Sequence, residues 1–125
     1  MDKVIHYAHE HYSQIKEWFA LRELPVPSHH SLPTNGFIVP GVAAGFIYLT
    51  DSDVSILDCF ISNPLTTDVD RDEALDSIAK HLIACAELHD TKILICNTVL
   101  KAIKDRAVYL GFTDTGMHFS LAKEL

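Results

Sequence analysis

Asp58 and Cys59 bring two reactive side chains together in an apolar part of this 125-residue chain. They lie in the run from Val54 to Ser62, where strand alternation places Asp58 on the same face as Ile56 and Phe60. A buried aspartate has a raised pKa and can accept a proton from an amine, directly or through water. An aspartate paired to a neighbouring side chain fits the pattern equally well. The thiol is better interpreted as a core group than as a nucleophile, because no Cys-His-Asn signature accompanies it.

The chain has eight histidines, and five of them suggest a metal site at first sight. His6, His9 and His11 lie close in sequence, and the pair His29 and His30 lies in a proline-rich stretch. A zinc site needs spacing set by a helix or strand and a cysteine or carboxylate partner, and no pattern such as His-Glu-x-x-His occurs. We predict no metal, and we interpret the His29-His30 pair as surface residues or part of a recognition face for a substrate or partner.

Composition limits the protein class. The formal charge is −7 with only ten scattered Lys and Arg, so no basic stripe is available for nucleic acid. The apolar runs are far shorter than the roughly 20 residues of a membrane span, and the N-terminus lacks a secretion signal. Three cysteines, at 59, 85 and 96, suit reduced core thiols. We therefore expect one cytoplasmic domain over residues 1–125 that binds neither nucleic acid nor membrane.

The periodicity of the sequence predicts an alternation of strands and helices that holds these groups. We expect a mixed α/β (α+β) fold, with a strand-helix-strand crossover in its second half. The predicted order is a strand at 3–7, a helix around 15–22, a long loop at 23–35, strands at 37–39, 42–49 and 54–62, a helix at 71–89, a strand at 92–96 buried on both faces, a helix from about Val99 to Leu110, and a closing strand or pair broken at Thr115-Gly116.

This order resembles the GNAT acetyltransferase superfamily over nearly the whole chain. Two local markers support the resemblance: Ile61 to Pro64 at the end of the fourth strand, where members often have an apolar-x-x-Pro, and Leu110-Gly111-Phe112 after the last helix. The resemblance implies a central antiparallel sheet with helices on both faces. Among such proteins, the chain is similar to small GNAT-like proteins encoded by bacteriophages, including internal virion proteins.

The resemblance implies an acetyl-CoA site where the fourth and fifth strands splay apart. Phe60, Ile61 and Ser62 would line it from the end of the fourth strand, and a bulge near 59–61 would polarise the thioester carbonyl. The pyrophosphate would sit on backbone N–H groups at the start of the long helix.

The family's phosphate-binding pattern is Arg or Gln, two residues, Gly, one residue, Gly or Ala, and this chain departs from it. Arg71 matches the first position, whereas Ala74 and Asp76 replace the two glycines. Asp76 would place a carboxylate near the phosphates, and two unit charges about 5 Å apart repel by about 3 kcal/mol at an effective dielectric of 20. Four more carboxylates lie close in sequence, at 68, 70, 72 and 73, where they would also stabilise a helix start.

The family's acid and asparagine are also missing. Many members have a tyrosine four residues before the glycine of Leu-Gly-Phe and an asparagine seven residues earlier, and these positions hold Ala107 and Leu100. Tyr109 is the nearest candidate acid, although it lies about 200° round the helix from Ala107. Asn97 is the nearest asparagine and lies three positions too early.

Three functions are consistent with the sequence. The first is a GNAT-fold protein whose acetyl-CoA site is degenerate, so that it binds the cofactor weakly or not at all and acts through a protein partner, as a structural, phage virion or host-directed factor. The second is an acetyl-CoA-dependent N-acetyltransferase in which Arg71 and backbone amides hold the pyrophosphate, with a small amine or a protein as acceptor near 23–35. The third is an acyl-CoA sensor without turnover.

Overall fold

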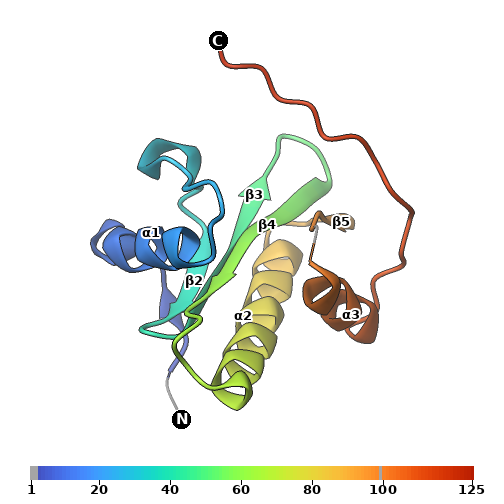
Figure 1. Ribbon diagram of the computed structural model, residues 1–125. Coiled ribbons are helices and arrows are strands. Elements are labelled where there is room, and N and C mark those ends of the chain that lie inside the picture. The colour runs from blue at the N-terminus through green and yellow to red at the C-terminus, as the bar shows by residue number, and fades with distance from the viewer. Residues whose placement is uncertain (1–2, 99) are drawn as a thin grey trace.

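The computed structural model describes residues 3–98 and 100–125 and has a five-stranded sheet at its centre (Figure 1). The strands follow one another across the sheet in chain order, and all neighbours are antiparallel except the last pair, which is parallel. The strands are β1 (Ile5–His6), β2 (Gly36–Val39), β3 (Ala43–Leu49), β4 (Val54–Ser62) and β5 (Ile93–Cys96). The predicted three-stranded meander is confirmed.

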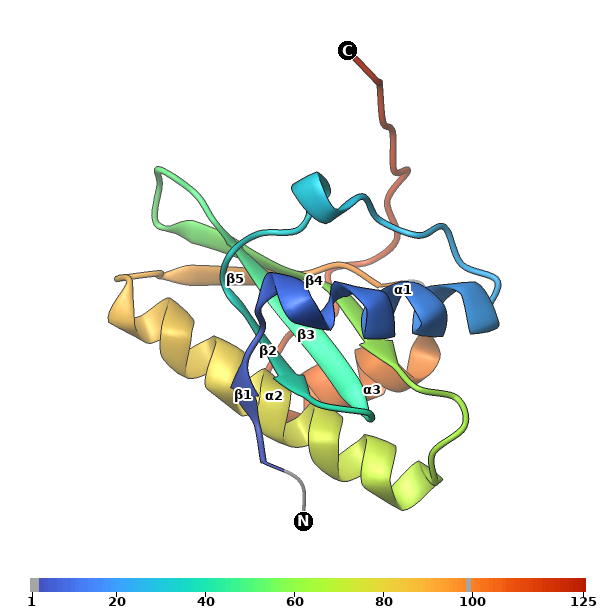
Figure 2. The same cartoon turned by 90° about the vertical axis from the view of Figure 1, so that its left-hand side faces the viewer.

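Helices cover both faces of the sheet, as predicted (Figures 1 and 2). The helices are α1 (Tyr12–Leu21), α2 (Asp68–Leu88) and α3 (Lys101–Tyr109), with short 3-10 helices η1 (His9–His11) and η2 (His29–Ser31). The predicted first residue of the last helix, Val99, lies outside the described residues. None of the helices in the described part of the chain is long and apolar enough to cross a membrane.

Each face of the sheet has its own apolar core because the strands alternate. Ile15, Trp18 and Phe19 of α1 pack with Phe46 and other residues of one face. On the other face, an apolar stripe of α2 packs against β2, β3 and β4, and its residues Ile78 and Leu82 have no exposed surface. α2 also provides the crossover that joins the parallel strands β4 and β5.

The parallel pair is much shorter than β4. It runs from the partners Val54 and Ile93 to the partners Leu57 and Cys96, so the last five residues of β4 have no neighbour on the β5 side. The space beyond β5 is where α3 lies, next to α2 (Figure 1).

Two expectations about the C-terminal part are wrong. The strand at 92–96 was expected to be buried on both faces, but Ile93 and Ile95 of β5 are 55% and 41% exposed, because α1 does not extend over this end of the sheet. The closing strand or pair is absent, since residues 111–125 contain neither helix nor strand. This C-terminal segment runs away from the sheet in both views (Figures 1 and 2).

Candidate functional site

The start of α2 decides where an anion could bind. Thr67 caps the helix, since its hydroxyl accepts a hydrogen bond from the N–H of Asp70 at 3.1 Å, and the helix begins at Asp68. Beyond the first turn, helical N–H groups donate to carbonyls four residues earlier, as the Arg71 N–H does to the Thr67 carbonyl at 3.1 Å. The stretch 71–76, expected at the helix start, therefore lies inside the helix.

The two residues that replace the family's glycines have structural roles within α2. Ala74 is 5% exposed and belongs to the core beneath the sheet. Asp76 forms an ion pair with Lys80 one turn later, with 2.9 Å between the carboxylate and the ammonium nitrogen. Neither side chain lines a cavity of the described structure near the end of β4. Asp76 therefore does not face the place where phosphates were expected.

A cavity of about 350 Å³ lies between the end of β4, the start of α2 and the start of α3. Of the predicted cofactor residues, it brings together four: Phe60, Ile61, Ser62 and Arg71. Asn97 is exposed after β5 and does not line the cavity.

Five charged side chains line the cavity. One of them, Arg71, is predicted from the sequence to bind the cofactor. The others are Arg22, Arg106, Asp68 and Asp72. Arg22 follows the last residue of α1 and lies 40 residues before its partner Ser62, so no local sequence pattern could have found it. The acidic pair had been interpreted as part of the helix start.

The arginines of the cavity already hold protein groups. Arg22 donates to the carbonyl and the hydroxyl of Ser62 at 2.8 and 2.7 Å, and its pKa is lowered by burial and by the charge of Arg71. The Arg71 guanidinium contacts the Asp68 carboxylate and two carbonyls of the loop before α2. Arg106 pairs with Asp72 at 2.9 Å. The Nε atom of Arg106 is buried without an acceptor among the described residues.

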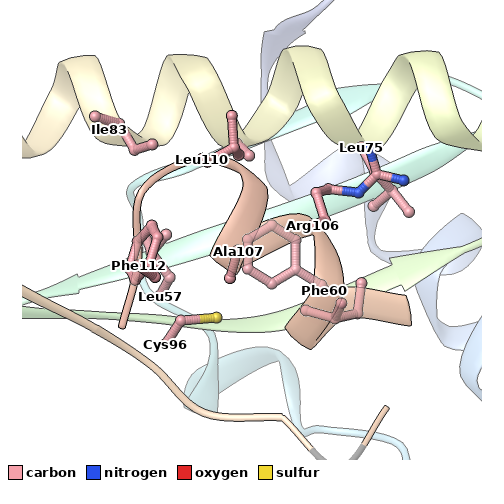
Figure 3. Close-up of a pocket in the computed structure, with 11 residues that line it drawn as sticks. Leu57, Phe60, Leu75, Ile83, Cys96, Arg106, Ala107, Leu110 and Phe112 are labelled. Carbon is pink, nitrogen blue, oxygen red and sulfur yellow. The ribbon is translucent and has the colours of Figure 1, made fainter. Parts of the chain in front are cut away.

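A second, inner cavity lies beside β5 and is almost filled (Figure 3). Its volume is about 20 Å³, which is room for about one water molecule. In Figure 3, Phe60 of β4, Cys96 of β5 and Ala107 of α3 converge on it, and Leu110 and Phe112 close it from the end of α3. The space between β4 and the end of β5, where the strands were expected to splay apart around the cofactor, is thus occupied by side chains.

The expected bulge in β4 is present and lies at Cys59. Ala44 of β3 faces Ile61, and two residues further along β3 Phe46 faces Asp58, so Cys59 and Phe60 together oppose Gly45. Cys59 has a φ of 58°, a conformation that costs a non-glycine residue about 1–2 kcal/mol.

The bulge corrects the predicted placement of Asp58. It was expected on the same face as Phe60, but the extra residue reverses the alternation after Asp58. Asp58 is paired with Phe46 on the α1 face, whereas Phe60 packs toward α2 and lines both cavities. One carboxylate oxygen of Asp58 accepts the N–H of Cys59 at 2.7 Å. The candidate base therefore lies on the opposite side of the sheet from the cavity.

The surroundings of the bulge favour the neutral forms of the Cys59 thiol and the Tyr48 hydroxyl. Burial raises the pKa of the Cys59 thiol, partly offset by the hydroxyl of Tyr48, which lies 3.5 Å from the sulfur. Burial also raises the pKa of Tyr48, and its hydroxyl donates to the Ser31 carbonyl at 3.1 Å. An unactivated thiol is consistent with the core interpretation of Cys59.

Tyr109 points away from both cavities and is 84% exposed. Ala107, two residues earlier, lines the inner cavity, as the helical period requires. The described structure thus places no tyrosine hydroxyl in either cavity.

The histidine pair of the long loop lies over the start of α1, on the side of the bulge rather than of the cavity. The Nδ1 atoms of His9 and His29 are 3.0 Å apart, and Tyr12 donates to the Pro27 carbonyl at 2.8 Å. His30 is exposed next to His29. Among the described residues, no three metal-ligating side chains form a group that could hold a metal ion.

Three solved structures described as acetyltransferases share this fold. No family model matches the sequence, and no curated protein does. A putative acetyltransferase from Agrobacterium tumefaciens str. C58 aligns with a TM-score of 0.70 and 12% identity over 97% of this chain and 99% of its own. An acetyltransferase of Trypanosoma brucei aligns with a TM-score of 0.66 and 12% identity over the same shares. A probable acetyltransferase aligns with a TM-score of 0.64 and 11% identity over 98% of both chains. The chain therefore has the GNAT-type acetyltransferase fold.

Proposed function

We propose that this protein is a non-catalytic member of the GNAT-type fold, which binds acetyl-CoA weakly or not at all and acts by binding another protein. The observation that carries the proposal is the start of α2. The stretch that would cradle the pyrophosphate lies inside the helix, where its N–H groups are already hydrogen bonded.

The donors that remain at the start of α2 lie beside negative charge. Thr67 already accepts the Asp70 N–H, and the first turn carries the carboxylates of Asp68 and Asp70. Asp68 and Asp72 also line the cavity, and each neutralises an arginine that would otherwise attract a phosphate. An entering pyrophosphate would have to displace these carboxylates, which makes tight binding unfavourable.

Acetyl transfer would also need a proton donor for the CoA thiolate and room for the thioester arm. A departing thiolate would need a proton donor near the inner cavity, where Ala107 lies and Tyr109 does not. That cavity has room for about one water molecule, and so a thioester arm could enter only if Phe60 or the end of α3 moved.

On this proposal, the fold serves to present a surface that binds another protein. With a formal charge of −7, the chain would attract a basic protein surface more readily than an acidic one. A structural or host-directed role of the kind found among phage-encoded GNAT-like proteins is consistent with such a surface.

An active N-acetyltransferase is the second candidate. It is favoured by the cavity of about 350 Å³ at the end of β4. It is also favoured by the buried Nε of Arg106, which has no acceptor among the described residues and could donate to an oxygen of a ligand. It is also favoured by the bulge at Cys59, whose backbone would lie near a thioester carbonyl. Water would then serve as the base, because Asp58 lies on the other face.

Calorimetry with acetyl-CoA distinguishes the candidates. We expect no binding in the micromolar range by the unaltered chain, and a gain of binding in the variant Asp68→Asn/Asp72→Asn, which frees Arg71 and Arg106. Glu73→Gln/Asp76→Asn is the matched control, since it removes two carboxylates from the same helix that do not line the cavity.

Micromolar binding by the unaltered chain would overturn the proposal. A release of CoA in the presence of small amines or of a lysine-containing peptide would then establish the N-acetyltransferase. Binding without release of CoA would identify an acyl-CoA sensor.

A further inference from the structure

The outer edge of β5 is an unprotected edge of the sheet. β5 pairs only with β4, and no other strand of the described chain lies beside it. Its four residues, Ile-Leu-Ile-Cys, include neither a charge nor a proline, the usual means of preventing edge pairing. Ile93 and Ile95 are exposed on one face, beside their β4 partners Val54 and Ile56. The edge therefore presents free backbone groups next to an apolar surface.

The C-terminal segment has the pattern of a strand that such an edge would accept. Met117, Phe119 and Leu121 alternate with smaller or polar residues. These three side chains are 100%, 98% and 92% exposed. Five residues of strand span about 17 Å, enough to cover the four residues of β5, which span about 13 Å. The segment 117–121 is thus a strand sequence without a partner in the described structure.

The exit of this segment from α3 directs it away from its own β5. The Phe112 N–H donates to the Ala107 carbonyl at 2.9 Å, and Asp114 forms an ion pair with Lys104 of α3 at 3.0 Å. The other contact of Asp114 is the N–H of Gly116, at 2.9 Å. After this anchor the chain runs outward, and the C-terminus lies well away from the sheet (Figures 1 and 2).

We propose that segment 117–121 pairs with the free edge of β5 in a second copy of the chain, and that the exchange is reciprocal. Each copy supplies one unpaired strand and one unpaired edge, so a twofold dimer satisfies both, whereas an unrelated partner would satisfy only one of them. In the register that places Phe119 on the face of Ile93 and Ile95, the apolar side chains of both elements bury one another. This inference does not depend on whether acetyl-CoA binds.

The area available is that of a weak, concentration-dependent dimer. Six large apolar side chains, three from each exchanged segment, would bury on the order of 100 Å² each, together about 600 Å². The exposed isoleucines of the two β5 strands and the backbone ladders add to this value. The total therefore approaches the roughly 1,000 Å² of the smallest specific interfaces, where association is weak and depends on concentration.

The test is the mass of the full chain in solution by light scattering and sedimentation over a range of protein concentrations. We expect a concentration-dependent dimer with amide protection at 117–121. Phe119→Ser should raise the dimer dissociation constant by about tenfold or more. Leu65→Ser is the matched control, because Leu65 is 77% exposed in the loop before α2, outside both β5 and the exchanged segment, and should leave the constant unchanged.

A complementation experiment tests the reciprocal exchange. Ile95→Lys alters the receiving edge and Phe119→Ser the exchanged strand, so a mixture of the two variants retains one intact strand and one intact edge. We expect the mixture to dimerise more strongly than either variant alone. A monomer at every concentration would overturn the proposal, with protection of 117–121 then showing pairing within one chain. A dimer indifferent to both variants would overturn it equally.

Discussion

Cys59 is a residue in a conformation that favours glycine. Its φ of 58° lies in the left-handed region, where the Cβ atom of an L-residue crowds the backbone. Its side chain packs partly against the cluster that joins α1 to the sheet, near the Tyr48 hydroxyl. These contacts and the opposing Gly45 hold the bulge in place, since a Cβ added at Gly45 would lie 2.6 Å from the Phe60 ring.

The strain at Cys59 predicts an unusual order of stabilities. Cys59→Gly and Cys59→Ala both lose the thiol, but only glycine relieves the left-handed strain of about 1–2 kcal/mol, against about 0.4–1 kcal/mol of extra unfolded-chain entropy. We expect the glycine variant to be the more stable of the two by about 0.5–1 kcal/mol in urea unfolding. At Ser55, in the regular part of β4, the same comparison should favour alanine. A more stable alanine variant at position 59 would show that the bulge carries no strain.

The bulge also explains which part of the site the sequence could predict. An irregularity near 59–61 followed from the resemblance, and the structure has one. The face of Asp58 did not follow, because one extra residue reverses every later side chain of a strand. Arg22 and Arg106 were missed for a different reason: their contacts join segments about 40 and 34 residues apart, which no local pattern reports.

At the scale of elements, periodicity predicted most of the helices and strands because their apolar stripes are strong. The start of α2 was placed three residues too late, although Thr67 followed by Asp68 and Asp70 is a readable cap with acidic residues in the first turn. The error mattered because it placed 71–76 at an anion-binding terminus rather than within the helix. The burial of β5 was also misjudged, since an apolar run reports composition and not what covers it.

The loop at 23–35 is an element whose attachment should depend on pH. Leu24 and Leu32 pack against the α1 cluster, and His29 contacts His9 at 3.0 Å. The pKa of His29 is lowered by partial burial and by the neighbouring charges of His9 and His30. A histidine whose folded pKa lies below its unfolded value of about 6.5 stabilises the fold above that pH and loses this contribution as the pH falls through the folded pKa.

We therefore expect the amides of the loop to exchange faster as the pH is lowered from about 7 to about 5, after correction for the intrinsic exchange rate. His29→Asn should remove most of this dependence, because no second positive charge can then form opposite His9. His118→Asn, in the C-terminal segment, is the matched control. A loop whose corrected exchange is the same at both pH values would show that the histidine contact does not hold it.

For the whole molecule, the fold class was predictable and the state of the C-terminus was not. Residues 111–125 contain a clear strand pattern, but a strand needs a partner, and whether the partner lies in the same chain is a question of geometry. The ion pair of Lys104 and Asp114, 3.0 Å apart, lies where the segment leaves α3, and it joins residues that no periodicity relates.

Removal of residues 115–125 should leave the isolated monomer as stable as before. The truncation keeps the pair of Lys104 and Asp114 and removes mostly exposed side chains, so we expect a change in the free energy of unfolding below about 0.5 kcal/mol at low protein concentration. The melting temperature of the full chain should rise with concentration, because a dimer is stabilised by mass action, and that of the truncated chain should not. A truncated chain that is less stable even at the lowest concentration would mean that the segment completes the sheet of its own copy, since only an intramolecular contact is independent of concentration.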